Sequence, residues 1–211
     1  ALATRPDLNY RARVRHQDNT GRWSHWSEPV EFVGPAPDVT PYLNSLVISE
    51  IMYHPATPTP AEVAAGFTDD DDFEYLELRN VGNETLDLSD VRFTKGIGAN
   101  LSGSLAPGKF VLVVRNQAAF EMRHGTGLPV VGEFEGKLDN GGERIKLSFG
   151  AGITILDFVY DDEAPWQTSP DGNGTSLVII HPLGLPDPGN PFTWRAATPT
   201  PGTSGSTTFP R

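Results

Sequence analysis

Four consecutive carboxylates at Asp69–Asp72 are the side chains whose type and spacing most clearly suggest ligand binding. Calcium takes several oxygen ligands and accepts irregular loops, so we consider a calcium site formed by Asp69, Asp70, Asp71 and Asp72. Four adjacent side chains cannot all point at one ion, however. A solvated acidic loop that keeps the protein soluble is the alternative. We expect no other cofactor.

Two further carboxylates lie inside strand-like runs. Glu50 alternates with Ile48 and Met52, so its side chain is expected on an apolar face, where it needs a hydrogen-bond partner. Glu77 is expected on the same face of its run as Arg79. We therefore predict a buried polar network of Glu50, Glu77 and Arg79. General acid–base catalysis would require the two carboxylates to lie in distinct environments around a cleft, and we predict no enzyme.

A second oxygen-rich segment is Asp171–Thr175. It lacks the Glu at the twelfth position of an EF-hand loop, so we predict a Gly-rich turn. Exposed indoles stack on sugar rings, and Trp166, Asp171 and Asn173 are therefore considered as a platform for a glycan. A Trp that plugs the end of the fold is the alternative. The 5 histidines show no metal-ligand spacing, and the sequence contains no nucleophile or phosphate-binding motif.

The composition indicates which elements position these side chains. In 211 residues, 22 Gly and 19 Pro fall between runs rich in Val, Ile, Leu and Phe, as turns do between the strands of an all-β protein. The net charge of -11 and the absence of a dense Lys and Arg patch exclude nucleic acid as a partner. No apolar run approaches the roughly 20 residues that span a bilayer, so we expect no membrane insertion. With no Cys, disulfides and zinc-thiolate sites are impossible.

Alternating apolar residues and turn residues predict eight strands in one main domain. Glu50 and Glu77 lie in the first two predicted strands, and the acidic run Asp69–Asp72 lies between these strands. A short helix at 117–124 is predicted from Asn116 as its N-cap and Gly125 as its end, and a helical turn at 59–66 from a Pro at its first position. The predicted strands are 46–53, 73–80, 84–88, 91–94, 110–115, 144–149, 153–160 and 175–181.

The runs at 46–53 and 73–80, the segment Leu86–Asp90 and the downstream segments Asp157–Tyr160 and Trp166–Leu177 resemble the lamin tail domain. The resemblance is to the form found in large bacterial surface proteins, and it covers roughly residues 44–197. It implies an immunoglobulin-like Greek-key β-sandwich and a non-catalytic module. In that family the acidic positions matched by Glu50 and Glu77 look like part of the fold signature rather than an active site.

The first 33 residues contain a separate pattern. In Asn9–His16, Arg11, Arg13 and Arg15 alternate with apolar residues, which predicts a strand with one buried face. The segment then reads Trp-Ser-His-Trp-Ser and resembles the last two strands of a fibronectin type III domain, in which arginines interleave with indoles. We therefore predict a ladder of Trp23 and Trp26 with the three arginines. A lone hairpin is marginal in water, so it is expected to dock on its own chain or to pair with a second copy as a homodimer; disorder is the remaining alternative.

The predicted organisation is a partial fibronectin-like hairpin at 1–33, a stiff Pro-rich linker at 34–43, the sandwich at 44–197 and a polar linker at 198–211. Because the sequence starts at Ala1 without a signal segment, we expect a piece of a larger exported bacterial protein, outside the cell or at its surface. We expect a structural or interaction module whose partners are neighbouring domains of the parent chain, another protein or a glycan. A calcium- or carbohydrate-dependent adhesion module is the alternative, and a hydrolase a more remote one.

Overall fold

A six-stranded sheet forms the larger layer of the fold in the computed structural model, which describes residues 8–203. Neighbouring strands are antiparallel except for β10 and β9, which are parallel. In spatial order the strands are β10 (Val130–Glu133), β9 (Phe110–Val114), β4 (Tyr75–Asn80), β3 (Leu46–Met52), β13 (Ser176–Ile179) and β14 (Trp194–Ala197).

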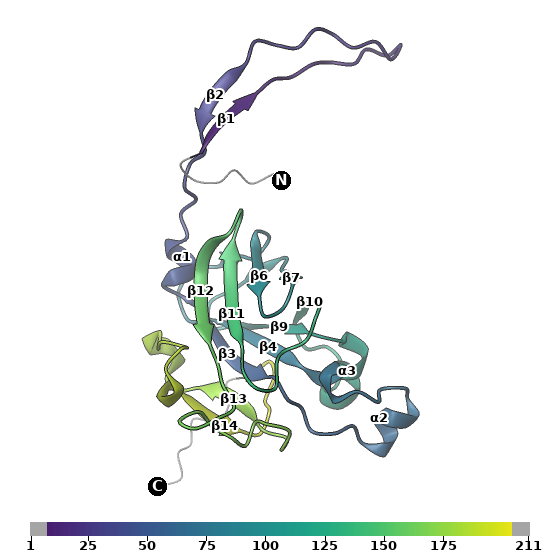
Figure 1. Cartoon of the computed structure of the whole chain (residues 1–211), viewed down its shortest axis with the longest axis vertical. Coiled ribbons are helices and arrows are strands. Elements are labelled where there is room, and N and C mark those ends of the chain that lie inside the picture. Colours follow the sequence, from purple (N-terminus) through teal and green to yellow (C-terminus); the bar gives the residue numbers. More distant parts are fainter. Residues whose placement is uncertain (1–7, 204–211) are drawn as a thin grey trace.

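A four-stranded antiparallel sheet forms the second layer, and a short two-stranded ribbon lies beside it. The order of the sheet is β12 (Ile153–Val159), β11 (Arg144–Phe149), β6 (Val91–Lys95) and β7 (Ala99–Asn100). The ribbon pairs β5 (Leu86–Asp87) with β8 (Ser104–Leu105). Figure 1 shows β11 and β12 in front of β3 and β4, so the two sheets stack as layers.

The main hydrophobic core joins the two layers. Ile51 and Leu78 from the large sheet belong to the same buried cluster as Ile145 and Leu147 from the smaller one, and all four are fully buried. A second, smaller cluster includes Tyr75 and Phe120, which lies in the short helix at 117–124. The prediction of an all-β sandwich is therefore confirmed. Its immunoglobulin-like Greek-key connectivity stays a prediction.

The helices are short, and two of them lie where helical segments are predicted, at 117–124 and within 59–66. The Asn116 side chain accepts the Ala119 N–H at 3.2 Å to start α3, and Gly125, at a φ of 89°, ends it. Helix α2 starts at Pro60 with a capping box between Thr59 and Glu62. The helical segments are α1 (Thr40–Leu43), α2 (Pro60–Ala64), η1 (Asp70–Phe73), α3 (Gln117–His124), η2 (Pro182–Gly184) and η3 (Pro191–Thr193).

All eight strands predicted in the main domain are present, with ends that differ by a few residues. One expectation about β3 is wrong. The pairing of β3 with β4 shifts between Ile48 and Glu50, which is a β-bulge. Ile48 therefore packs in the main core, whereas Met52 packs in the smaller cluster. Glu50 lies on the side of the sheet that carries Met52, and the simple alternation with Ile48 fails at the bulge.

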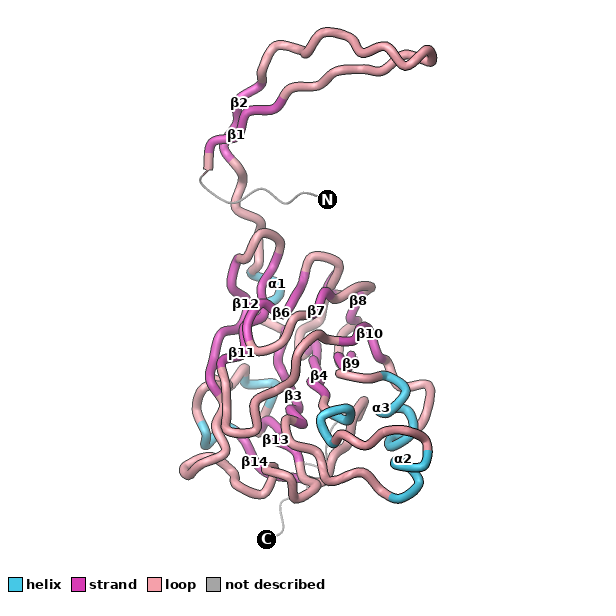
Figure 2. Tube along the Cα trace, turned by 45° about the vertical axis from the view of Figure 1, so that its right-hand side comes forward, coloured by secondary structure: helices cyan, strands magenta, loops and turns pink. Residues whose placement is uncertain are grey.

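The N-terminal hairpin projects from the sandwich. Strands β1 (Asn9–Ala12) and β2 (Val30–Val33) pair with each other, and Figures 1 and 2 show the hairpin extended beyond α1, away from the two sheets. Docking of the hairpin on its own main domain is thus not seen in the described part of the chain. The rings of Tyr10 and Phe32 stack at 5.6 Å within the hairpin, and Phe32 is 42% exposed.

Both predicted linkers are partly held by the sandwich. In the first, Tyr42 is buried and its hydroxyl donates to the Asp87 carbonyl at 2.6 Å. In the second, Pro201 is buried and the Gly202 N–H donates to the Glu77 carboxylate at 2.6 Å. The rest of that predicted linker, 204–211, lies outside the described residues.

Candidate functional site

The acidic run lies in a short 3₁₀ helix at one end of the sandwich. Asp69 caps this helix by accepting the Asp71 N–H at 3.2 Å. The turn gathers Asp69, Asp70 and Asp71 so that one carboxylate oxygen of each lies within 4.8 Å of the others. Asp72 instead accepts a hydrogen bond from the Asn116 side chain at 3.3 Å, so it faces α3. Three of the four predicted ligands are therefore brought together.

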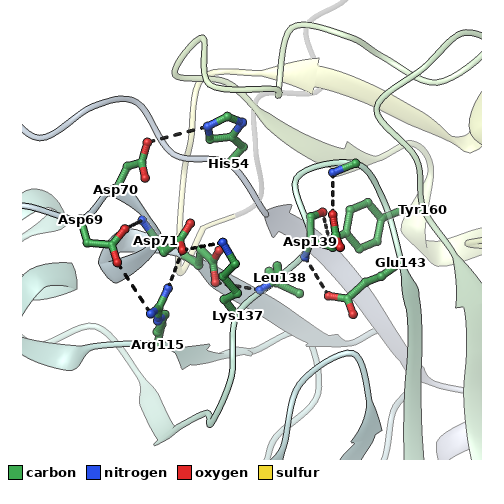
Figure 3. Close-up of polar contacts among 12 residues, drawn as sticks. His54, Asp69, Asp70, Asp71, Arg115, Lys137, Leu138, Asp139, Glu143 and Tyr160 are labelled. Atoms are coloured by element: carbon green, nitrogen blue, oxygen red, sulfur yellow. Dashed lines mark hydrogen bonds and ion pairs between the residues drawn. The ribbon is translucent and has the colours of Figure 1, made fainter.

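Two basic side chains of the protein already contact this cluster (Figure 3). The Asp71 carboxylate lies 3.0 Å from Arg115 and 3.1 Å from Lys137, and Arg115 also reaches Asp69 at 3.9 Å. Burial alone would raise the pKa of Asp71, but the adjacent Lys137 and Arg115 cations outweigh it and lower that pKa. Asp71 is thus a buried carboxylate that stays ionised because cations of the chain neutralise it.

Glu74 follows the acidic run and is completely buried. One carboxyl oxygen accepts the Leu138 N–H at 2.9 Å, whereas the other has no hydrogen-bond partner. Burial, with a smaller effect of the nearby Asp71 charge, raises the pKa of Glu74 to about 9. Glu74 is therefore a neutral acid at neutral pH, unlike the ion-paired Asp71 beside it.

His54 joins the acidic loop to the predicted turn at 171–175. Its Nδ1 lies 2.5 Å from Asp171, and its Nε2 lies 3.7 Å from Asp70 (Figure 3 shows the second contact). Gly172, at a φ of +72°, lets the turn approach closely, since a Cβ there would lie 3.1 Å from the His54 ring. The histidines were not predicted to form a site, and His54 could be singled out only by its place at the end of a strand.

The residues considered for a glycan platform make separate contacts within the fold. Trp166 is half-buried and packs against the main core, as a Trp that plugs the end of the fold would. Asn173 is exposed and donates to the Asp171 backbone carbonyl at 2.8 Å, which closes the Gly-rich turn. The Asp171 carboxylate pairs with the His54 side chain, as described above.

The buried carboxylates Glu50 and Glu77 lie directly opposite each other on β3 and β4, and each is 1% exposed. Arg79, predicted as the third member of their network, stacks over the Phe110 ring at 4.9 Å. The hydrogen-bond partners of Glu77 are the Ser49 hydroxyl, at 2.6 Å, and the Gly202 N–H. Arg79 lowers the pKa of Glu77 through its charge alone, so hydroxyl and backbone groups take the role predicted for it.

Sequence reasoning missed a cavity of about 450 Å³ between the 55–59 loop, α2 and α3. Its polar lining includes Glu62 and Arg123, whose two hydrogen bonds measure 2.8 and 2.9 Å. These bonds lower the pKa of Glu62 to about 2, and Arg123 also stacks 3.4 Å from the Phe73 ring centre. The remaining wall is largely apolar and includes Met52, Pro55, Phe73, Met122 and Pro199.

In the N-terminal hairpin, Arg15 lies between the two indoles. Its guanidinium carbon is 4.2 Å from the Trp23 ring centre and 4.7 Å from that of Trp26. Arg11 instead faces Glu31 at 3.8 Å, and Arg13 is exposed. Of the three arginines predicted for the ladder, Arg15 is the one that stacks on the indoles.

No family model, curated protein or solved structure matches this chain. Among the described residues, none of the helices has the length and apolar character needed to cross a membrane. The site is therefore interpreted from its own geometry.

Proposed function

We propose that this chain is a non-catalytic structural and interaction module of a large exported bacterial protein, and that the hairpin of β1 and β2 contacts its partner. One observation supports this role above the others. Large apolar side chains of the hairpin are 42–63% exposed, among them Val14, Trp23, Trp26, Val30 and Phe32. Large exposed apolar side chains concentrated in one short element favour a contact with another protein.

The partner we propose is a neighbouring β-domain of the same parent chain. A two-stranded hairpin is marginal in water, and each of its two edges exposes backbone groups that a further strand can pair with. The resemblance to the end of a fibronectin type III domain, given by Arg15 between Trp23 and Trp26, supports a partner that supplies the remaining strands. The location that goes with this proposal is outside the cell or at its surface, where such multidomain proteins act.

The test is titration of the chain with the neighbouring domains of its parent protein, followed by tryptophan fluorescence. Covering Trp23 and Trp26 should shift their emission to shorter wavelength, and a double Trp23→Phe, Trp26→Phe variant should lose this shift because Trp166 and Trp194 lie in the sandwich. Sedimentation of the chain alone reports pairing between two copies. A chain that stays monomeric and shows no shift with any neighbouring domain would refute the proposal.

A calcium- or carbohydrate-dependent adhesion module is a second candidate, and one observation favours it. The oxygens of Asp69, Asp70 and Asp71 are gathered within 4.8 Å, and His54 joins their loop to the turn containing Asp171. The test is the melting temperature with calcium and with a chelator. A calcium-dependent rise that disappears in Asp70→Asn would support adhesion, and an unchanged melting temperature would leave the interaction module alone.

A further inference from the structure

Two buried carboxylates face each other across the centre of the large sheet. Glu50 on β3 is paired in register with Glu77 on β4, and each is 1% exposed. Like charges directly opposite each other destabilise a sheet, and a buried carboxylate needs hydrogen-bond donors. The arrangement therefore depends on which groups donate to this pair and on how many charges it carries.

Three hydroxyl groups of the sheet supply part of the donors. Tyr75 and Ser176 each donate to Glu50 at 2.5 Å, and Ser49 donates to Glu77 at 2.6 Å. Tyr75 stays a neutral donor because burial raises the pKa of its hydroxyl. These bonds hold the two carboxylates on one side of the sheet, beside the smaller hydrophobic cluster to which Tyr75 belongs.

The remaining donors come from the segment Thr198–Thr203, which follows the last strand. The Thr200 N–H donates to Glu50 at 3.2 Å, and the Gly202 N–H donates to Glu77 at 2.6 Å. Between them Pro201 is buried, and a Cβ on Gly202 would lie 3.0 Å from Leu128. Each carboxylate thus makes one link to the same short segment.

We propose that Glu50 and Glu77 form a proton-operated clasp for the segment Thr198–Thr203, closed when the pair holds one proton and opened when both carboxylates are ionised. With one proton the pair carries a single charge and keeps both backbone links. When the pair holds no proton, two negative charges lie opposite each other in a buried site. Movement of the segment Thr198–Thr203 away from the sheet then admits water that solvates both charges. The clasp thereby controls how firmly the chain is held where it leaves the sandwich.

The charged groups around the pair fit this scheme. Arg195 on β14 and Arg79 on β4 act on Glu50 and Glu77 through their charge, and both favour ionisation. His124 on α3 packs against Tyr75, but burial lowers its pKa to about 4, so it is neutral over the range considered. Burial raises the pKa of both carboxylates, that of Glu77 to about 7 with a contribution from the opposed Glu50 charge. It outweighs the hydroxyl and backbone N–H donors, including Thr200 and Gly202, and the smaller effect of the arginines, all of which favour ionisation. The clasp is therefore closed in mild acid and opens above neutral pH.

The test is amide hydrogen exchange of Thr200 and Gly202 in the full chain by NMR, expressed as protection factors so that base catalysis of exchange is removed. Protection should fall by up to about tenfold per pH unit above neutrality at these two amides and remain level for strand amides such as Leu112. Glu77→Gln removes the charge and keeps the size of the side chain: its amide oxygen can accept the Gly202 N–H, and its NH2 can donate to the Ser49 hydroxyl oxygen. Thr200 and Gly202 of this variant should therefore stay protected at pH 8.5.

A matched control is Glu143→Gln, because burial also raises the pKa of Glu143 but its carboxylate accepts the Asp139 N–H at 3.0 Å, outside the clasp. This variant should exchange like the wild type at Thr200. If a clasp variant does not fold, carbon-13 shifts of the wild-type Glu50 and Glu77 carboxyl groups supply the titration directly. Level protection of both amides from pH 5.5 to 8.5, or carboxyl shifts that show ordinary acidic titration of both groups, would overturn the proposal.

Discussion

Replacing Glu74 by Gln should make the protein more stable in alkaline solution. Glu74 is completely buried, and its carboxyl group has one hydrogen-bond donor, the Leu138 N–H at 2.9 Å. A Gln side chain can accept the same bond through its amide oxygen and cannot ionise. The substitution thus removes the titration of this group while it preserves the packing around it.

The magnitude follows from the pKa. Burial raises the pKa of Glu74 from 4.5 to about 9 in the folded state. A group with a raised folded pKa gives its full stability below its unfolded pKa, and this stability is lost as the pH rises toward the folded value. Each pH unit in that window is worth about 1.4 kcal/mol, so the free energy of unfolding should drop by about 4 kcal/mol between pH 4.5 and 7.5 through this group alone.

The assay is urea unfolding of the wild type and of Glu74→Gln at a series of pH values from 5 to 8.5. The two proteins should have similar stability at pH 5, and the variant should be the more stable by about 4 kcal/mol at pH 7.5. Glu84→Gln is the control, because Glu84 is exposed and its variant should follow the wild type. A Glu74→Gln curve that runs parallel to the wild type would mean that Glu74 is ionised and neutralised by Lys137, and the reasoning from burial would be wrong.

Three further predictions concern other parts of the chain. A version that starts at Val39 should unfold within about 1 kcal/mol of the whole chain by urea titration, because the hairpin pairs with itself and projects from the sandwich, whereas a large loss would mean that it docks. Arg123→Ala should destabilise the fold by about 3 kcal/mol in the same assay, since it leaves the buried Glu62 carboxylate without its cation; a neutral effect would contradict this. Gly142→Ala should cost at least about 2 kcal/mol more than Gly152→Ala, because both have a positive φ but only the first Cβ would meet a backbone carbonyl, at 2.5 Å; equal losses would show that no clash occurs.

Much of the fold was predictable because it is encoded locally. The largely apolar runs of β3 and β4 and the caps of α3 depend on residues within a few positions of each other. The strands that were missed are β7 and β8, with two residues each, and β10 and β14, with four each. Such short segments have too few residues to show an alternation of apolar and polar side chains. They form strands because their backbone pairs with a neighbouring strand.

The candidate site was predictable only in part, for a related reason. The acidic run is visible as a run, but its basic partners Arg115 and Lys137 lie far along the chain, and so does Asp171, the partner of His54. The bulge in β3, which decides the side on which Glu50 lies, is a register shift between two strands. Contacts at long sequence separation are set by the packing of the sheets, and no local pattern reports them.

The acidic end of the sandwich and the N-terminal hairpin are the two candidate interaction surfaces, and they differ in the cost of removing water and existing partners from them. At the acidic end, Arg115 and Lys137 already neutralise Asp71, so an incoming cation must compete with two charges held by the fold. In the hairpin, Trp23 and Trp26 expose more than half of their surface, and covering apolar surface yields about 25 cal/mol per Å² without displacing any partner. Arg15 is compatible with this, because a guanidinium stacked between indoles can be covered together with them. The desolvation balance therefore favours the hairpin as the contact surface and leaves the acidic end to hold the loops of the sandwich together.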